Sequence, residues 1–128
     1  MLKYAAMAMA ISALPVSAEP LTGNQLLTIC GDDTDLSIPG AAYCMGFIEG
    51  TIGGIEWGTS FPLFADGGDD KTVYAKRDAI LGFCLPDGAT VAQYRDISVK
   101  FLRDRPEQRH KSAIGLIHMA MREAFPCD

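Results

Sequence analysis

Residues 84–127 decide the fold: CLPDGATVAQYRDISVKFLRDRPEQRHKSAIGLIHMAMREAFPC. Thr90 and Gln93 have the spacing of a capping box, in which each side chain satisfies a backbone amide of the other at the start of a helix. Apolar residues then recur at helical spacing, at Val91, Tyr94, Ile97, Phe101 and Leu102. This pattern predicts a helix that ends at Arg105, because the residue before Pro106 is disfavoured in the helical conformation.

A final helix is predicted to begin between Glu107 and Ser112 and to stop at Pro126. One face of it is apolar: Ala113, Leu116, Ile117, Ala120, Met121, Ala124 and Phe125. The short link between the two helices predicts an antiparallel pair. That geometry returns Cys127 towards Cys84.

Upstream, Thr22 is placed to cap a short helix that runs to Cys30. Cys44 opens the next predicted helix, with 13 residues between it and Cys30. An even number of cysteines in a short exported chain indicates disulfides, and four cysteines allow three pairings. We predict that Cys30 pairs with Cys44 and that Cys84 pairs with Cys127. By restricting the unfolded chain, these bridges are expected to stabilise the fold by about 3 and about 4 kcal/mol, respectively. Zinc is the weaker alternative because no CxxC pair is present, and no metal or cofactor site is predicted.

The second helix is predicted from about residue 41 to residue 57, with Ser37 as its cap and Pro39 in its first turn. Glycines recur every four residues along it, at Gly46, Gly50 and Gly54. Each costs about 1 kcal/mol of helix propensity relative to alanine. We therefore expect the glycine face to be buried against another helix, which makes this the central helix. Gly50→Leu is then expected to destabilise the protein by overpacking.

Residues 58–82 have the least regular pattern. The run from Phe61 to Phe64 is apolar without a clear period, and residues 66–70 form an acidic, glycine-containing tip. We expect an irregular insert, followed by a weaker fifth helix over residues 71–81. The tip lacks the alternating oxygen ligands and the closing glutamate of a calcium-binding loop, which favours a solvated turn.

The first 18 residues predict a signal peptide. Lys3 is followed by an apolar run to Leu14 and by a small-residue cleavage site that ends at Ala18. This run is shorter than the roughly 20 apolar residues of a membrane span. Cleavage would leave residues 19–128 as one exported domain. The predicted fold class is all-α, a small bundle of four to five helices stapled by two disulfides.

The charge is unevenly distributed along the chain. The net charge is −5, and the loss of Lys3 with the signal would take it to −6. Residues 19–70 contain nine acidic residues and no lysine or arginine. An acidic chain does not neutralise phosphates, so a nucleic-acid partner is not expected. The acidic half suits a basic protein partner, or simply keeps a small protein soluble.

The sequence contains no catalytic signature such as GxSxG, HExxH or a phosphate-cradling glycine loop. We interpret His110 as a local hydrogen-bonding residue and His118 as a surface residue. Glu49 and Glu56, seven residues apart on one helix, are interpreted as two solvated carboxylates rather than an acid and a base. No catalytic residue is predicted, and a small hydrolase is the weaker alternative.

Three segments resemble the Rap/Tai family of amidase immunity proteins. They are the run FCLPDGAT at 83–90 with Gln93 after it, the run CMGFIEG at 44–50, and the tail that includes Phe101-Leu102, Arg105-Pro106-Glu107, Arg109-His110, Ala113 and Ala124-Phe125-Pro126-Cys127. The resemblance implies an all-helical, disulfide-bonded periplasmic protein, often a dimer. It also implies a protein that plugs the cleft of a peptidoglycan amidase delivered by type VI secretion. The alternative is a periplasmic acid-stress or chaperone-like helical protein.

Loops on a rigid scaffold commonly carry recognition, so we expect the partner to bind the stretch from residue 58 to residue 70. Phe61 and Phe64 are the expected apolar anchors, and Asp66, Asp69 and Asp70 are expected to meet a basic rim on the partner. In the competing interpretation the two phenylalanines cap the core and the aspartates face water.

Overall fold

The computed structural model describes residues 19–31 and 39–128, and within them helices account for most of the chain. The α-helices are α1 (Gly23–Cys30), α2 (Pro39–Ala65), α3 (Asp70–Leu81), α4 (Val91–Asp104) and α5 (Ala113–Ala124), with a 3₁₀ turn at Pro106–Gln108. The all-α fold is therefore confirmed. The predicted signal segment and the expected cap Ser37 lie outside the described residues.

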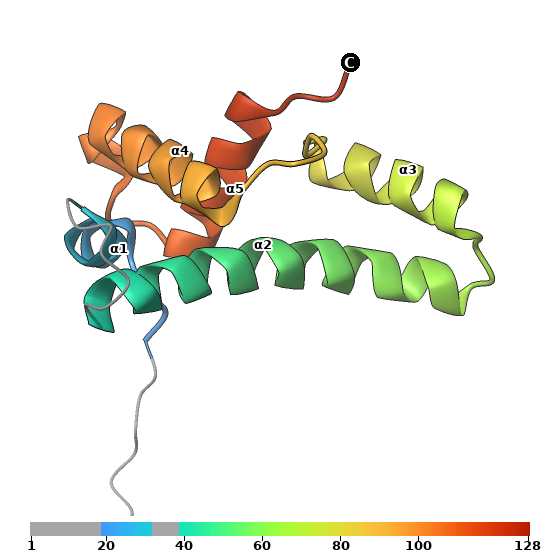
Figure 1. The fold of residues 1–128 in the computed structure, drawn as a ribbon, viewed down its shortest axis with the longest axis horizontal. Helices are drawn as coiled ribbons and strands as arrows, with labels where there is room; N and C mark the ends of the chain where they lie inside the picture. The colour runs from blue at the N-terminus through green and yellow to red at the C-terminus, as the bar shows by residue number, and fades with distance from the viewer. Residues whose placement is uncertain (1–18, 32–38) are drawn as a thin grey trace, which may run out of the picture.

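Figure 1 divides the molecule into a body and an arm. The body consists of α1, the first half of α2, α4 and α5, which surround the hydrophobic core. The largest fully buried side chains include Leu26, Ile48, Phe83, Leu102, Leu116, Ile117 and Met121. The arm consists of α3 and the second half of α2, which run side by side beyond the other helices.

The α4–α5 pair follows the expected pattern closely. Thr90 and Gln93 form the capping box at the start of α4, and α4 ends one residue before Arg105. The predicted stripe of α5 is buried from Ala113 to Met121, whereas Ala124 is exposed and Phe125 is half-buried. The apolar spacing therefore identified the face of α5 that packs into the core.

Both disulfides form as predicted. Cys30 pairs with Cys44, with the two Cα atoms 5.3 Å apart, and Cys84 pairs with Cys127 at 5.0 Å. The first bridge joins the end of α1 to the first half of α2. The second joins the segment before α4 to the tail after α5.

A buried cation that was not predicted, Arg95 of α4, lies at the end of α1. The Arg95 guanidinium of α4 donates to the backbone carbonyl of Cys30 at 2.6 Å, and Arg103 donates to that of Gly31 at 2.9 Å. The last carbonyls of a helix have no partner within it and carry partial negative charge. The two arginines satisfy these carbonyls and join α4 to α1.

The irregular insert expected between residue 58 and residue 70 was wrong, whereas the fifth helix expected over residues 71–81 is confirmed as α3. α2 continues unbroken to Ala65, with Pro62 inside it, and α3 fills residues 70–81. Glycine and proline cost about 1 and about 3 kcal/mol within a helix. Packing against α3 offsets this cost, because Ser60 on α2 and Val73 on α3 are both buried between the two helices.

The expectation of a buried glycine face on α2 was also wrong. Gly46, Gly50 and Gly54 are exposed, and an added Cβ would have no neighbouring atom within 4 Å at any of them. The face of α2 that enters the core is instead the opposite one, with Cys44, Ile48 and Ile52. Overpacking by Gly50→Leu is therefore no longer expected. α2 is central to the fold, but it contacts the core through its β-branched residues.

Candidate protein-binding surfaces

The acidic tip lies at the far end of the arm, in the turn between α2 and α3. The turn is closed by backbone hydrogen bonds from Asp66 to Pro62, at 3.1 Å, and from Gly68 to the carbonyl of Leu63, also at 3.1 Å. A Cβ on Gly68 would lie 2.9 Å from that carbonyl oxygen and 2.7 Å from a methyl of Val73. The turn is thus closely packed against its two helices. Asp66, Asp69 and Asp70 are all exposed on it.

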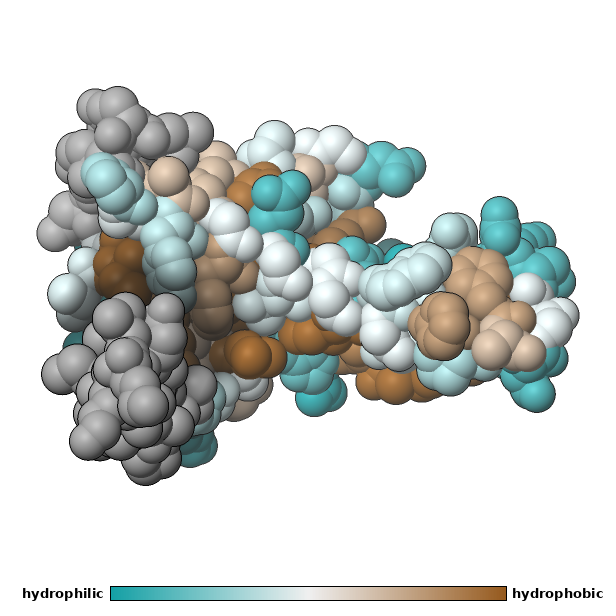
Figure 2. All heavy atoms as spheres, turned by 90° about the horizontal axis from the view of Figure 1, so that it is seen from below, coloured by the Kyte–Doolittle hydropathy of each residue, from teal (hydrophilic) through white to brown (hydrophobic). Residues whose placement is uncertain are grey.

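Asp69 has a structural role within this tip. It is the N-cap of α3, and its carboxylate accepts hydrogen bonds from the backbone amide and the hydroxyl of Thr72, both at 3.0 Å. These bonds to Thr72 hold the pKa of Asp69 below its usual range. Asp66 and Asp70 extend the negative charge on either side. In Figure 2 the arm is the narrow projection, and its end is mostly hydrophilic with apolar side chains beside it.

The two phenylalanines expected as anchors lie in different surroundings. Phe64 is half-buried, with its ring edge-on to Tyr74 of α3 at 5.9 Å between centroids. Phe61 is 60% exposed and lies beside Trp57 at 6.1 Å on the outer side of α2. Phe64 with Tyr74 therefore gives the tip an apolar flank. Phe61 belongs to a separate aromatic surface along α2.

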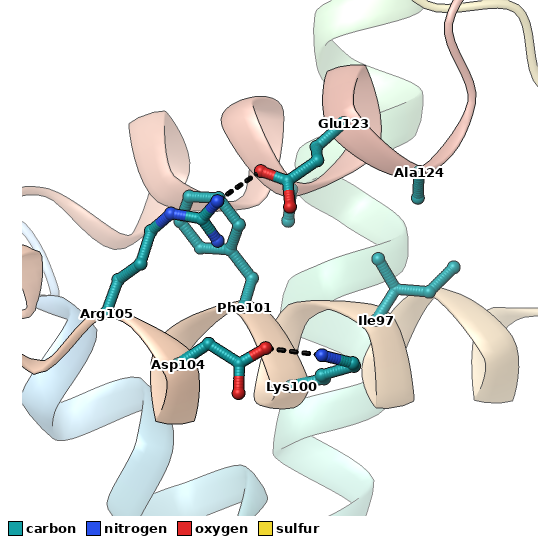
Figure 3. Close-up of a pocket in the computed structure, with 8 residues that line it drawn as sticks. Ile97, Lys100, Phe101, Asp104, Arg105, Glu123 and Ala124 are labelled. Atoms are coloured by element: carbon teal, nitrogen blue, oxygen red, sulfur yellow. Dashed lines mark hydrogen bonds and ion pairs between the residues drawn. The ribbon is translucent and has the colours of Figure 1, made fainter.

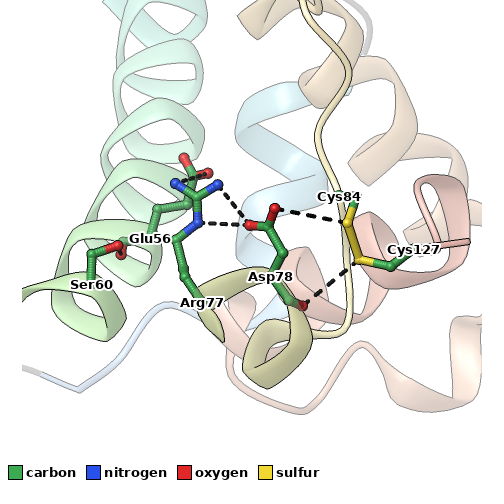
Figure 4. A network of polar contacts seen from close by, with 6 residues as sticks. All are labelled: Glu56, Ser60, Arg77, Asp78, Cys84 and Cys127. Carbon is green, nitrogen blue, oxygen red and sulfur yellow. Dashed lines mark hydrogen bonds and ion pairs between the residues drawn. A yellow bond between two sulfur atoms is a disulfide. The ribbon is translucent and has the colours of Figure 1, made fainter. Parts of the chain in front are cut away.

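Polar contacts hold the base of the arm (Figure 4). Arg77 of α3 lies 3.3 Å from the Glu56 carboxylate of α2 and 2.6 Å from the carboxylate of Asp78. Glu56 is half-buried and ion-paired, so its interpretation as a solvated carboxylate was wrong. Burial raises the pKa of Glu56, Arg77 opposes that change, and Asp78 adds to it. The Cys84–Cys127 bridge lies beside Asp78, with each sulfur 3.8 Å from an oxygen of that residue.

His118 also joins the arm to the body. Its Nε2 lies 2.9 Å from the carbonyl oxygen of Leu81, the last residue of α3, and its ring is 5.8 Å from that of Phe83. His118 is half-buried rather than on the surface, which corrects the sequence interpretation. His110 is exposed.

A hollow lies between α4 and α5 in the body (Figure 3). It measures about 210 Å³, which is below the roughly 300–1,000 Å³ of small-molecule sites. The charges around it are already paired, Lys100 with Asp104 and Arg105 with Glu123. The Arg105 guanidinium also covers the ring of Phe101 at 4.3 Å. This hollow offers little to a small ligand.

The described residues contain neither a metal-type cluster of side chains nor a membrane-spanning helix. Among residues 19–31 and 39–128, no three histidine, cysteine, aspartate or glutamate side chains gather as a metal site would need. No described helix has the length and apolarity required to cross a membrane. Two exposed surfaces with apolar side chains have been described, one at the acidic tip and one along the outer side of α2.

The fold and these surfaces define a small, disulfide-stapled helical protein with surfaces suited to protein partners. The family of Rap1a immunity proteins matches residues 22–127, and the chain belongs to that family. Comparison with curated proteins and with solved structures gave no match. Membership makes this an immunity protein, whose partner is an effector protein. The two disulfides fit an oxidising compartment.

Proposed function

We propose that this protein acts in the periplasm, where it binds a peptidoglycan amidase delivered by type VI secretion and blocks its cleft with the tip of the α2–α3 arm. The main observation in support of this proposal is that the arm extends beyond the other helices (Figure 1). Two packed helices joined by a tight turn present a narrow, preorganised end, and preorganisation reduces the entropy lost on binding. The protein has no catalytic role in this mechanism. It acts by occupying the space that a peptide substrate would fill.

The chemistry of the tip fits a basic cleft rim around an apolar pocket. Asp66 and Asp70 supply exposed negative charge, while Phe64 and Tyr74 supply an apolar flank. Asp69 adds charge and holds the start of α3. An apolar centre with a polar rim is the usual anatomy of a tight protein interface. A second copy of the chain is the other partner we propose, and it would engage Phe61 rather than the tip.

The experiment measures binding to a cognate amidase, sought as the product of the neighbouring gene. Asp66→Asn combined with Asp70→Asn leaves the Asp69 cap intact. We expect this variant to associate more slowly and with a weaker dependence on salt, as is typical of rim charges. Phe64→Ala should instead speed dissociation. Ile80→Ala, an exposed apolar change further along α3, is the matched control. Unchanged binding and protection by both tip variants would place the effector surface elsewhere.

The alternative function, in acid stress, predicts different behaviour at low pH. A chaperone of that kind should expose apolar surface on acidification, whereas an immunity protein should stay folded and bind one enzyme. Binding of an apolar-sensing dye between pH 7 and pH 3 separates the two. Increased dye binding together with suppression of client aggregation would favour the chaperone.

A further inference from the structure

The two disulfide bridges differ in how far solvent reaches them. Cys30 is 0% exposed and Cys44 is 1% exposed, so the first bridge lies inside the core. Cys84 is half-buried and Cys127 is exposed, so the second bridge is open to solvent at its Cys127 end. Thiol–disulfide exchange requires a thiolate to reach one of the two sulfurs. In the folded protein, a thiol in solution therefore has access to the second bridge and not to the first.

The second bridge lies where the arm meets the body (Figure 4). Cys84 belongs to the segment between α3 and α4, and Cys127 belongs to the tail after α5. Both sulfurs lie beside the last turn of α3. Sγ of Cys84 is 3.8 Å from the carboxylate of Asp78, and Sγ of Cys127 is 3.8 Å from the backbone carbonyl oxygen of the same residue. The bridge therefore fastens the tail of the body beside the end of the arm.

Few other contacts hold the end of α3 to the body. α3 packs along α2 and contacts α4 and α5 little. The Nε2 atom of His118 lies 2.9 Å from the carbonyl oxygen of Leu81, and the backbone amide of Cys84 donates to the carbonyl of Phe125 at 2.9 Å. Beyond Phe125, the residues of the tail are exposed. The covalent bridge is thus a main attachment between the tail and the last turn of α3.

Negative charge lies on the Cys84 side of the bridge. One carboxylate oxygen of Asp78 accepts hydrogen bonds from Arg77, and the other faces the sulfur of Cys84. The C-terminal end of a helix also carries partial negative charge, and the last turn of α3 contains no basic residue. Negative charge nearby disfavours a thiolate. Asp78 should therefore make Cys84 a slow leaving group in thiol exchange.

We propose that the Cys84–Cys127 bridge is a thiol-exchange site that a dithiol reduces while the rest of the fold stays intact. Reduction releases the last turn of α3 from the tail and loosens the base of the arm. The buried Cys30–Cys44 bridge and the apolar core keep the body folded. The charge of Asp78 sets how fast the exchange proceeds.

The exchange consists of two balanced steps. A thiolate of the dithiol attacks the exposed sulfur of Cys127, the bond to Cys84 breaks, and the electron pair leaves on the Cys84 sulfur. That sulfur takes a proton from water, and its S–H is then placed to donate weakly to Asp78. The second thiolate of the dithiol attacks its own sulfur in the mixed disulfide, and Cys127 leaves and is protonated. Two electrons pass to the bridge, and the dithiol becomes a disulfide.

The first test treats the purified protein with dithiothreitol without denaturant and then alkylates the free thiols. Peptide mapping should find the label on Cys84 and Cys127 while Cys30 stays joined to Cys44. Glutathione, a monothiol, should be trapped first as a mixed disulfide on Cys127. Resistance of the second bridge until denaturant is added, or equal rates for both bridges, would overturn the proposal. Glutathione found first on Cys84 would overturn the order of attack.

Two substitutions separate the effect of charge from that of loosened packing. Asp78→Asn should speed reduction roughly fivefold, the effect of one unit charge about 4 Å away in water. Arg77→Gln leaves the charge of Asp78 unbalanced and should slow reduction. Both variants break the contact between Arg77 and Asp78, so loosened packing alone would speed reduction in both. Acceleration in both variants would show that Asp78 does not act through its charge.

The same rates, measured with dithiothreitol and with a reduced thioredoxin-type protein at equal thiol concentration, identify the source of the dithiol. Faster reduction by the protein assigns the exposed end of the bridge to a protein dithiol. Faster reduction by dithiothreitol assigns it to small dithiols. Reduction by neither would overturn the proposal.

The closing test measures amide hydrogen exchange after selective reduction. Amides in the last turn of α3 should exchange about tenfold faster, because local opening there no longer has to move the tail. Amides of α1 and α4 should exchange as before. The variant with Cys84→Ser and Cys127→Ser should show the same pattern without reductant and should not respond to dithiothreitol. Unchanged exchange in α3, or equal acceleration in every helix, would overturn the local release. None of these measurements needs an effector, so their results are independent of the proposed function.

Discussion

The body and the arm are both built from two or more packed helices, yet they are stabilised in different ways. The body buries large apolar side chains from four helices around Leu26, Ile48 and Leu116, and both disulfides adjoin it. The arm buries little more than Ser60 and Val73 between its two helices, and its other contacts include a capped turn and an ion pair. Stability is therefore concentrated in the body. The surfaces suited to partners lie on the arm and along α2, where large apolar side chains such as Trp57 and Phe61 are exposed.

The largest expected effect tests the second disulfide, which lies where the arm meets the body. Changing Cys84 and Cys127 together to serine should lower the free energy of unfolding by about 4 kcal/mol, because a long loop is released in the unfolded state. The measurement is chemical denaturation monitored by circular dichroism. Full reduction of the parent protein breaks both bridges and should therefore cost more than the double serine variant does. If the variant and the parent had the same denaturation midpoint, the Cys84–Cys127 bridge would not stabilise the folded protein.

A core truncation compares the two regions directly. Leu116 is 1% exposed, and Leu116→Ala should cost about 3 kcal/mol through lost burial and the cavity left behind. Ile80→Ala removes a similar aliphatic side chain from the exposed side of α3 and should change stability by no more than about 0.5 kcal/mol. Thermal or denaturant unfolding of both variants checks the contrast. Equal losses would mean that the arm contributes to the same core.

Two glycine substitutions should change stability in opposite directions. Gly68→Ala places a Cβ 2.9 Å from the carbonyl oxygen of Leu63, so the turn at the tip must shift, at a cost of about 1–2 kcal/mol. Gly115 lies at an exposed position of α5, and a Cβ added there meets no atom within 4 Å. Gly115→Ala should therefore stabilise the protein by about 0.5–1 kcal/mol. Melting temperatures show the sign of each effect. A neutral Gly68→Ala would mean that the tip is not tightly packed.

The smallest expected effect concerns the pH dependence of the ion pair at the base of the arm. Burial raises the pKa of Glu56 above its usual 4.5, so the folded state binds this proton more tightly than the unfolded state does. The contribution of Glu56 to stability is therefore most favourable below the usual pKa and is lost as the pH rises through the raised one. Glu56→Gln should match the parent at acidic pH and be more stable at neutral pH, by less than about 1 kcal/mol, since Arg77 retains Asp78.

Denaturation curves at several pH values test this sign. Glu49→Gln removes a charge from an exposed position of the same helix and serves as the control. A Glu56→Gln variant that is less stable than the parent at neutral pH would show that attraction to Arg77 outweighs the cost of burial. The ion pair between Glu56 and Arg77 would then stabilise the base of the arm at neutral pH.

The sequence alone determined the features that depend on local chemistry and on simple helix geometry. The Thr90–Gln93 cap, the break at Pro106, the apolar stripe of α5 and the two cysteine pairs were all predicted, because each depends on residues close in sequence or on one antiparallel turn. The aspartates of the tip were also identified as exposed charge. Their role as partner-binding residues stays a prediction.

The tertiary structure decided the features in which packing overrides local preference. Gly58 and Pro62 predict a break in α2, but α3 packs along this segment and keeps it helical to Ala65. Spacing placed three glycines on one face of α2, but spacing does not show whether that face meets another helix or solvent. The core took the opposite face because Ile48 and Ile52 bury more apolar area there than glycines can. Arg95 and Glu56 likewise acquired their partners only when α4 met α1 and α3 met α2.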